Sequence, residues 1–287
     1  MAGARLVLPN LASLPQRGDL AARWALARQL GLDAVEMPAD LVKSRREERM
    51  TGQPIGAVPN EDAVVQLYRP GAGARYVLHT DPGIPRRDGA VVVPELRWND
   101  DRWTAAYASF LVQVAERLGP PPEVVEVHAG RESSVAEVVK AMTALRDRLS
   151  AATGAAVTVA VENKPGQAVA TVDDILRAAE LMNDEDGLGI MLDVPNLWKA
   201  GRRRAERGIG SFPHHRLVGM HVHENHRAPA LGGAVDWPSV RQLLQRTGRP
   251  VLINPEVFHR GELLKALRFV REELLGSAPN PHKGGGP

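Results

Sequence analysis

Eight short apolar runs alternate with amphipathic segments along this chain of 287 residues. The runs predict strands at residues 6–8, 34–37, 76–79, 124–128, 157–162, 189–193, 218–223 and 251–256. A strand followed each time by a helical segment is typical of a parallel sheet with crossover helices. Eight such units fit a closed (β/α)8 barrel, the TIM barrel. We therefore expect an α/β fold in which residues 1–276 form a single barrel domain.

The expected helices show the period of an amphipathic helix. Apolar residues recur every three or four positions within residues 20–30 and 103–118, and the aromatic residues among them are expected in the core. Start signals agree with these assignments, because a capping box precedes two further apolar segments. The two boxes are Ser134 with Glu137 and Thr171 with Asp174.

Composition narrows the possible chemistry. Hydrophobic residues make up 44% of the chain, enough for a sizeable core. The sequence has no apolar run of about 18 residues and no leader-like N-terminus, so we expect a cytoplasmic protein without a membrane segment. It contains no cysteine. Disulfides, thiolate metal sites and cysteine nucleophiles are therefore excluded, and any metal must be held by carboxylates and imidazoles.

Charge and loop composition suggest where ligands bind. The 36 basic and 34 acidic residues give a net charge of +2, which makes a nucleic-acid partner unlikely on charge grounds. Arginine clusters at residues 45–46, 86–87 and 202–204 fit solvated surfaces better than phosphate sites. Residues 81–101 and 225–237 follow strand ends, and each is either a substrate-binding loop or a surface excursion. The tail at residues 277–287, rich in Gly and Pro, is expected to be disordered.

Potential metal ligands stand at the ends of six expected strands. A lone acid or histidine at such a place is usually a surface group, but parallel barrel strands converge at their carboxyl ends. Acids gathered there would repel one another and be poorly solvated unless a cation lay between them. Oxygen ligands with an imidazole suit Mn²⁺, Mg²⁺ or Co²⁺, and Zn²⁺ also fits. The six residues are His79, His128, Glu162, Asp193, His221 and Glu256.

Four segments resemble the ends of strands five to eight in the xylose isomerase-like superfamily of sugar isomerases, sugar epimerases and apurinic endonucleases. They are VENKP at 161–165, LDVPN at 192–196, MHVHEN at 220–225 and NPEV at 254–257. The resemblance implies one divalent ion held by Glu162, Asp193, His221 and Glu256.

His223 competes with His221 for the imidazole role, because the HVH sequence places both rings on one strand face. His221 is favoured, since Glu224 then falls where family members often carry an acid three residues after the ligand.

Two cationic residues also resemble functional groups of that superfamily. Lys164 matches the lysine of the EPKP segment in xylose isomerases, where it would polarise the substrate carbonyl. The alternative is a lysine that merely neutralises the carboxylates. Arg227 follows His221 at the six-residue offset of the substrate-contacting arginine in ketose 3-epimerases, which implies contact with a hydroxyl or phosphate group.

The match has departures as well. The epimerases carry an acid where this chain has Ala168, and a histidine where it has Asn196. In the apurinic endonucleases, histidines at the positions of His79 and His128 bind additional zinc ions. The pair Glu224 and His226 could partly replace that family's remaining acid and histidine ligands.

The leading expectation is a metal-dependent isomerase or epimerase of a small sugar, sugar acid or sugar phosphate, with Glu162, Lys164 and Glu256 as catalytic groups. One alternative is a phosphodiesterase acting on abasic DNA, which needs two or three metal ions. Another is a non-catalytic barrel that binds a small polyol. The superfamily's barrels are commonly homo-oligomers, so assembly is possible. Expected substrate-binding residues are His79, His128, Asn163, Asn196, His223, Glu224 and Arg227.

Overall fold

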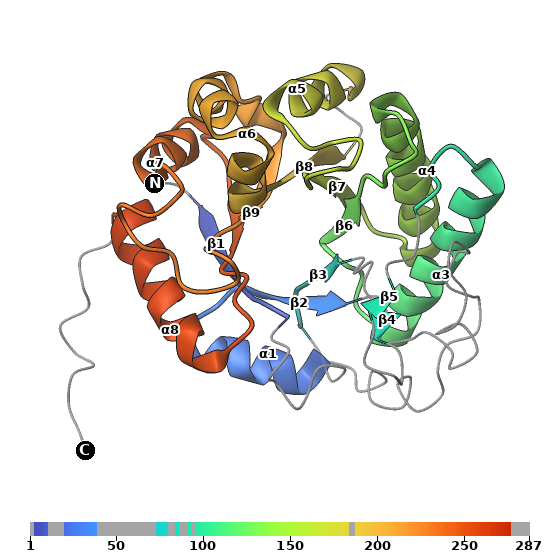
Figure 1. The fold of residues 1–287 in the computed structure, drawn as a ribbon. Helices are drawn as coiled ribbons and strands as arrows, with labels where there is room; N and C mark the ends of the chain where they lie inside the picture. Colours follow the sequence, from blue (N-terminus) through green and yellow to red (C-terminus); the bar gives the residue numbers. More distant parts are fainter. Residues whose placement is uncertain are drawn as a thin grey trace.

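Eight parallel strands close a barrel in the computed structural model, which describes residues 3–10, 20–38, 73–79, 84–85, 91–92, 96–183 and 187–276. Around the barrel the strand order is β1-β10-β9-β8-β7-β6-β3-β2 (Figure 1). The expected (β/α)8 fold is confirmed. The strands are β1 (Ala4–Leu8), β2 (Ala34–Pro38), β3 (Tyr76–His79), β6 (Val124–His128), β7 (Thr158–Glu162), β8 (Leu188–Asp193), β9 (Leu217–His221) and β10 (Val251–Asn254).

Helices surround the barrel on its outside (Figure 1). They are α1 (Leu20–Gln29), α3 (Asp101–Leu118), α4 (Val135–Thr153), α5 (Val172–Leu181), α6 (Val194–Gly208), α7 (Trp237–Arg246) and α8 (Arg260–Phe269). Both expected capping boxes are present, at the starts of α4 and α5. The aromatic residues of α3 are buried as expected, and the rings of Trp103 and Tyr107 stack with centroids 4.9 Å apart. Within the described ranges, no helix is both long and apolar enough to span a bilayer.

Two strands end earlier than the sequence suggested. Strands were expected over residues 218–223 and 251–256, but β9 ends at His221 and β10 ends at Asn254. Pro255 follows Asn254 and has no N–H group with which to continue the ladder. The Glu256 N–H instead turns back to the Asn254 carbonyl at 2.9 Å. Glu256 and His223 therefore sit on the first residues of the loops, not within strands.

Several sequence expectations fall on parts of the chain outside the described residues. These are the tail 277–287, the arginine pairs 45–46 and 86–87, and most of the loop 81–101. Within that loop, β4 (Ile84–Pro85) and β5 (Val91–Val92) pair as a small antiparallel sheet.

Side chains inside the barrel form an apolar layer with a polar layer above it. The apolar layer consists of Val7, Ala34, Val77, Val124, Ala160, Met191 and Leu252. Because strand side chains alternate with period two, the residue two positions later points into the barrel nearer its carboxyl end. On six of these seven strands that residue is polar, namely Glu36, His79, Glu126, Glu162, Asp193 and Asn254. The apolar layer is thus the floor of a polar site.

Gly130 fixes the chain just beyond β6. Its φ is +73°, and a Cβ added there would lie 2.5 Å from the carbonyl oxygen of Leu96. The neighbouring Trp98 donates its indole N–H to the His128 carbonyl at 2.8 Å. Close packing at a glycine therefore holds the strand end that carries His128.

We expect Gly130→Ala to lower the free energy of unfolding more than Gly154→Ala does, as measured by urea denaturation. Gly154 also has a positive φ, +66°, but a Cβ there meets nothing within 4 Å. Both variants lose roughly 1–2 kcal/mol to the left-handed backbone. Gly130→Ala should lose about 1–3 kcal/mol more through overpacking against residue 96. Equal losses in the two variants would contradict this account.

Candidate metal centre

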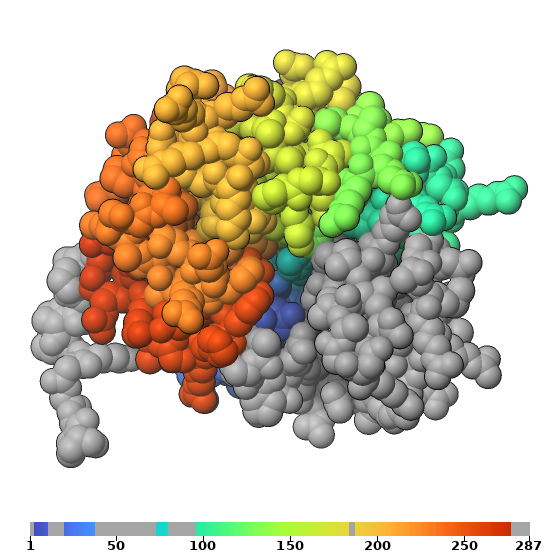
Figure 2. Space-filling model, in the orientation of Figure 1, coloured from blue at the N-terminus to red at the C-terminus, as the bar shows by residue number. Residues whose placement is uncertain are grey.

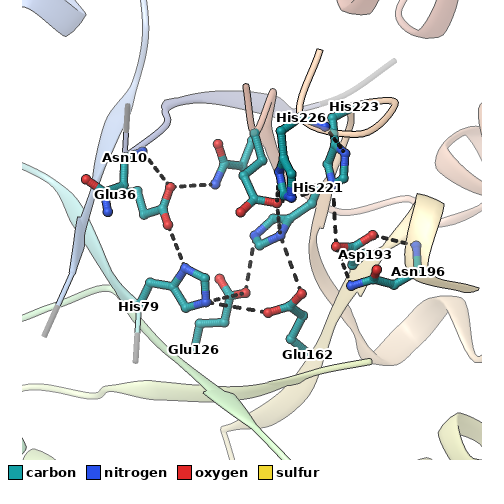
Figure 3. Close-up of polar contacts among 12 residues, drawn as sticks. Asn10, Glu36, His79, Glu126, Glu162, Asp193, Asn196, His221, His223 and His226 are labelled. Carbon is teal, nitrogen blue, oxygen red and sulfur yellow. Dashed lines mark hydrogen bonds and ion pairs between the residues drawn. The ribbon is translucent and has the colours of Figure 1, made fainter. Parts of the chain in front are cut away.

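Five carboxylates meet the imidazoles of four histidines in the polar layer. Figure 3 labels four of these acids and three of these histidines. The acids come from β2, β6, β7, the end of β8 and the loop after β10. All except Glu256 are at most 3% exposed, and the Glu256 side chain is 16% exposed. Ionised groups this deeply buried are stable only when opposite charge or hydrogen bonds surround them. The acids are Glu36, Glu126, Glu162, Asp193 and Glu256, and the histidines are His79, His128, His221 and His223.

His221 lies at the centre of the four residues expected to hold the ion. Asp193, His221 and Glu256 offer ligand atoms that all lie within 4.8 Å of one another. The Nδ1 atom of His221 lies 3.4 Å from Glu256 Oε2 and 3.9 Å from Glu162 Oε1. The structure therefore brings Glu162 and Glu256 to one nitrogen of His221, with Asp193 in the same cluster.

The other nitrogen of His221 faces an acid that sequence reasoning did not identify. Glu126 is fully buried, and its Oε1 lies 3.2 Å from His221 Nε2. A carboxylate beside Nε2 favours the proton on that nitrogen and leaves the lone pair on Nδ1. Both ring nitrogens are buried, and neither has a hydrogen-bond partner among the described residues. An unpartnered lone pair that faces carboxylates fits a cation ligand.

A second group of possible ligands adjoins the first and shares Glu162 with it. The Glu162 Oε2 atom lies 2.5 Å from His128 Nε2 and 3.4 Å from His79 Nε2. The opposite side of the His79 ring contacts Glu36, with 2.6 Å between Nδ1 and Oε1. Glu36 in turn accepts hydrogen bonds from the Asn10 backbone N–H and the Asn254 amide. Glu36 was also missed by the sequence reasoning, and it orients His79.

The pKa shifts in the polar layer show that positive charge is strongly stabilised there. Burial lowers the pKa of His79 and of His221, but the nearby acids, Glu126 foremost, raise both well above the usual value. Burial raises the pKa of Glu162 and of Glu256, and the facing imidazoles bring both well below the usual range. A divalent cation would stabilise the ionised acids in the same way, without protonation of the imidazoles.

Two asparagines hold Asp193 in place. The Asn163 amide donates to the Asp193 carbonyl at 3.0 Å and accepts from the Asp193 N–H at 2.8 Å. Asn196 donates its side-chain N–H to Asp193 Oδ2 at 2.7 Å, and its backbone N–H to Oδ1 at the same distance. Asp193 is also the N-cap of α6. Substrate contact by these asparagines stays a prediction; the structure shows them positioning an acid.

The remaining expected site residues lie around this centre. Lys164 is half-buried, and no carboxylate of the described residues pairs with its ammonium group. Glu224 accepts a hydrogen bond from the Trp237 indole at 3.4 Å. Arg227 is exposed beside Glu262, whose pKa is lowered mainly by Lys265 and to a smaller degree by Arg227. Their predicted roles stay predictions.

The sequence contains a signal for Glu36 and Glu126, the two buried acids that were not predicted. Glu126 stands two residues before His128, and Glu36 stands two residues after the interior Ala34. Extending the period of two along every strand would have placed both acids inside the barrel. Neither acid stands at the end of an expected apolar run that was read for ligands, so the strand-end pattern did not include them.

A family model described as xylose isomerase-like TIM barrel matches residues 24–273. The chain belongs to this family. A comparison with curated proteins gave no match.

Several solved structures have a similar fold. A D-tagatose 3-epimerase-like protein has a TM-score of 0.60 at 15% identity, with 94% of this chain and 97% of that chain covered. An AP endonuclease, family 2, from Brucella melitensis has a TM-score of 0.57 at 13% identity, with coverages of 94% and 98%. The IolI protein with a bound zinc atom has a TM-score of 0.56 at 12% identity, with coverages of 96% and 100%. At these identities the likeness shows the shared fold.

We expect Asn163→Ala to lower the free energy of unfolding by roughly 2–4 kcal/mol in urea denaturation. The change leaves the buried N–H and C=O of Asp193 without these partners, and each costs about 1–3 kcal/mol. Asn99→Ala is the matched control, because Asn99 is exposed and its loss should cost less than about 0.5 kcal/mol. A loss of unfolding free energy in Asn163→Ala no larger than that in Asn99→Ala would show that the hydrogen bonds between Asn163 and Asp193 do not stabilise the fold.

Proposed function

We propose that this chain is a divalent-metal-dependent isomerase or epimerase acting on a small sugar, sugar acid or sugar phosphate. The observation that carries the proposal is the convergence of Asp193, His221 and Glu256 within 4.8 Å, with Glu162 facing the same His221 nitrogen. Membership of the xylose isomerase-like family and structural likeness to a D-tagatose 3-epimerase-like protein support it.

The ligand set suits a hard or borderline cation. Three carboxylates and one imidazole favour Mn²⁺, Mg²⁺ or Co²⁺, and Zn²⁺ is compatible with them. Such an ion would orient adjacent substrate oxygens and stabilise negative charge that develops on them.

The chain's own residues would move protons and stabilise charge. Glu256 is the most exposed of the five acids, so it is the acid best able to exchange a proton with a substrate. Glu162 faces the same His221 nitrogen as Glu256 does and would serve as the second acid. Lys164 stands two residues after Glu162, and its ammonium group would polarise a substrate carbonyl. Ala168 offers no acid, so proton exchange falls to the ligand carboxylates.

We expect Glu162→Gln and Glu256→Gln each to weaken Mn²⁺ binding at least about tenfold in calorimetry, because each removes one anionic ligand from a buried site. Glu116→Gln is the control, since Glu116 is exposed on α3 and should leave the affinity unchanged. Parent-like affinity in both site variants would refute the centre.

Lys164→Met should lower kcat/KM by about 10²–10³-fold, because it removes a charge that stabilises the transition state. The assay uses the best substrate from a panel of free and phosphorylated aldoses and ketoses. Mn²⁺ affinity should change less than about twofold. A large change in affinity with an unchanged rate would mean that Lys164 only neutralises the acids. Stoichiometric metal without turnover across the panel would instead indicate a ligand-binding barrel.

One observation favours a second candidate, phosphodiester hydrolysis. His79, His128 and Glu162 form another group of ligand atoms within 4.8 Å, so two ions could share Glu162. Adjacent ions can stabilise both the attacking and the leaving oxygen of a phosphodiester. The near-neutral charge of the chain argues against strong DNA affinity.

Elemental analysis of the purified protein separates the two candidates. For an isomerase with a single centre we expect about one ion per chain and no salt-sensitive binding to duplex DNA. Two or three ions per chain, together with cleavage of a duplex that carries an abasic site, would establish the second candidate.

A further inference from the structure

The two histidines of the HVH segment have different hydrogen-bond surroundings (Figure 3). His223 Nδ1 lies 3.1 Å from the backbone nitrogen of His226, which donates its hydrogen to the ring. A backbone N–H is always a donor, so Nδ1 must be the acceptor. The neutral His223 ring therefore carries its proton on Nε2.

That proton points at two of the expected ligands. His223 Nε2 lies 3.4 Å from Asp193 Oδ2 and 3.3 Å from Glu256 Oε2. Carboxylate oxygens are acceptors, so both contacts use the same N–H. We propose that His223 is a positioning residue that holds Asp193 and Glu256 together, and that His221 alone supplies an imidazole ligand. This inference rests on the metal centre proposed above.

A strained turn supplies the donor that fixes His223. Asn225 and His226 have φ values of +49° and +56°, which cost roughly 1–2 kcal/mol each for non-glycine residues. Backbone hydrogen bonds between Glu224 and Arg227, in both directions, close the turn. The His226 ring stacks on the His223 ring at 4.5 Å and on the Phe258 ring at 3.8 Å. These contacts hold the His226 N–H against His223 Nδ1.

The proton arrangement is opposite in His221. Glu126 Oε1 lies 3.2 Å from its Nε2, and Glu256 Oε2 lies 3.4 Å from its Nδ1. The shorter contact favours the proton on Nε2, which leaves the Nδ1 lone pair facing the other acids. In His223 the Nδ1 lone pair accepts the His226 N–H, and Nε2 carries the proton. The His223 ring therefore has no free lone pair with which to bind an ion. Although His223, His226 and Glu256 lie within 4.8 Å of one another, they do not form a second ion site through His223.

The surrounding charges are compatible with this assignment once an ion is bound. Burial lowers the pKa of His223, and hydrogen bonds to Asp193 and Glu256 raise it to about 9 without an ion. A second proton would have to sit on Nδ1, where it would face the His226 N–H. A divalent ion bound to Asp193 and Glu256 offsets their negative charge, so these acids no longer favour a second proton on His223.

Two substitutions separate the two nitrogens of His223. In His223→Gln the amide N–H stands near the place of Nε2 and keeps the donor. In His223→Asn the amide oxygen stands near the place of Nδ1 and keeps only the acceptor. In Zn²⁺ titration by calorimetry we expect His223→Gln to bind within about threefold of the parent and His223→Asn to bind about 10–100-fold more weakly.

Nuclear magnetic resonance identifies the ligating ring directly. In ¹⁵N-labelled protein loaded with ¹¹³Cd²⁺, we expect cadmium coupling to His221 Nδ1 and none to His223, whose Nε2 carries a proton. Cadmium coupling to His223 would overturn the proposal. So would parent-like Zn²⁺ affinity in His223→Asn, or equally large losses in both variants.

A failure of the metal centre itself gives a different result. If the parent binds neither Zn²⁺ nor Cd²⁺, the proposed function fails. The His223 assignment is then decided by the ¹⁵N signals of the metal-free protein at a pH where the ring is neutral. A proton on Nε2 would support His223 as the hydrogen-bond donor to Asp193 and Glu256. A proton on Nδ1 would overturn this assignment.

Discussion

The burial of several carboxylates in one layer of the barrel is the constraint on which the rest of the site depends. Glu36, Glu126, Glu162 and Asp193 are almost completely shielded from water, so each must be compensated within the protein. The structure does this by placing imidazoles against the acids, as in the contacts of His79 with Glu36 and of His128 with Glu162. The apolar floor beneath them and the caps and glycines around them fix the geometry of these contacts.

Much of this arrangement could be predicted from the sequence. The eight strands were predicted because each is a compact apolar run, and six candidate ligands were predicted because they end such runs. Glu36 and Glu126 were missed because an acid inside an apolar strand looks like an outward-facing residue unless its period is traced. The choice between His221 and His223 could not be made firmly, because it depends on ring nitrogens and on a turn with positive φ that sequence patterns do not encode.

The differences from the epimerase pattern acquire a physical meaning in the structure. Asn196 stands where the resemblance expects a histidine, and it donates both its side-chain and its backbone N–H to Asp193. A histidine there could offer a lone pair, whereas the Asn196 amide donates hydrogens. The replacement gives Asp193 two hydrogen-bond donors and takes away an imidazole at this position.

The double use of Asp193 links the centre to the outer ring of helices. The Asp193 carboxylate caps the first turn of α6 and also stands among the expected ligands. An ion bound to this carboxylate would draw electron density from it and weaken its capping hydrogen bond to the Asn196 N–H. Trp198, buried on the next turn of α6, would sense this redistribution. Binding of an ion at the proposed centre is therefore expected to change the indole emission of this helix.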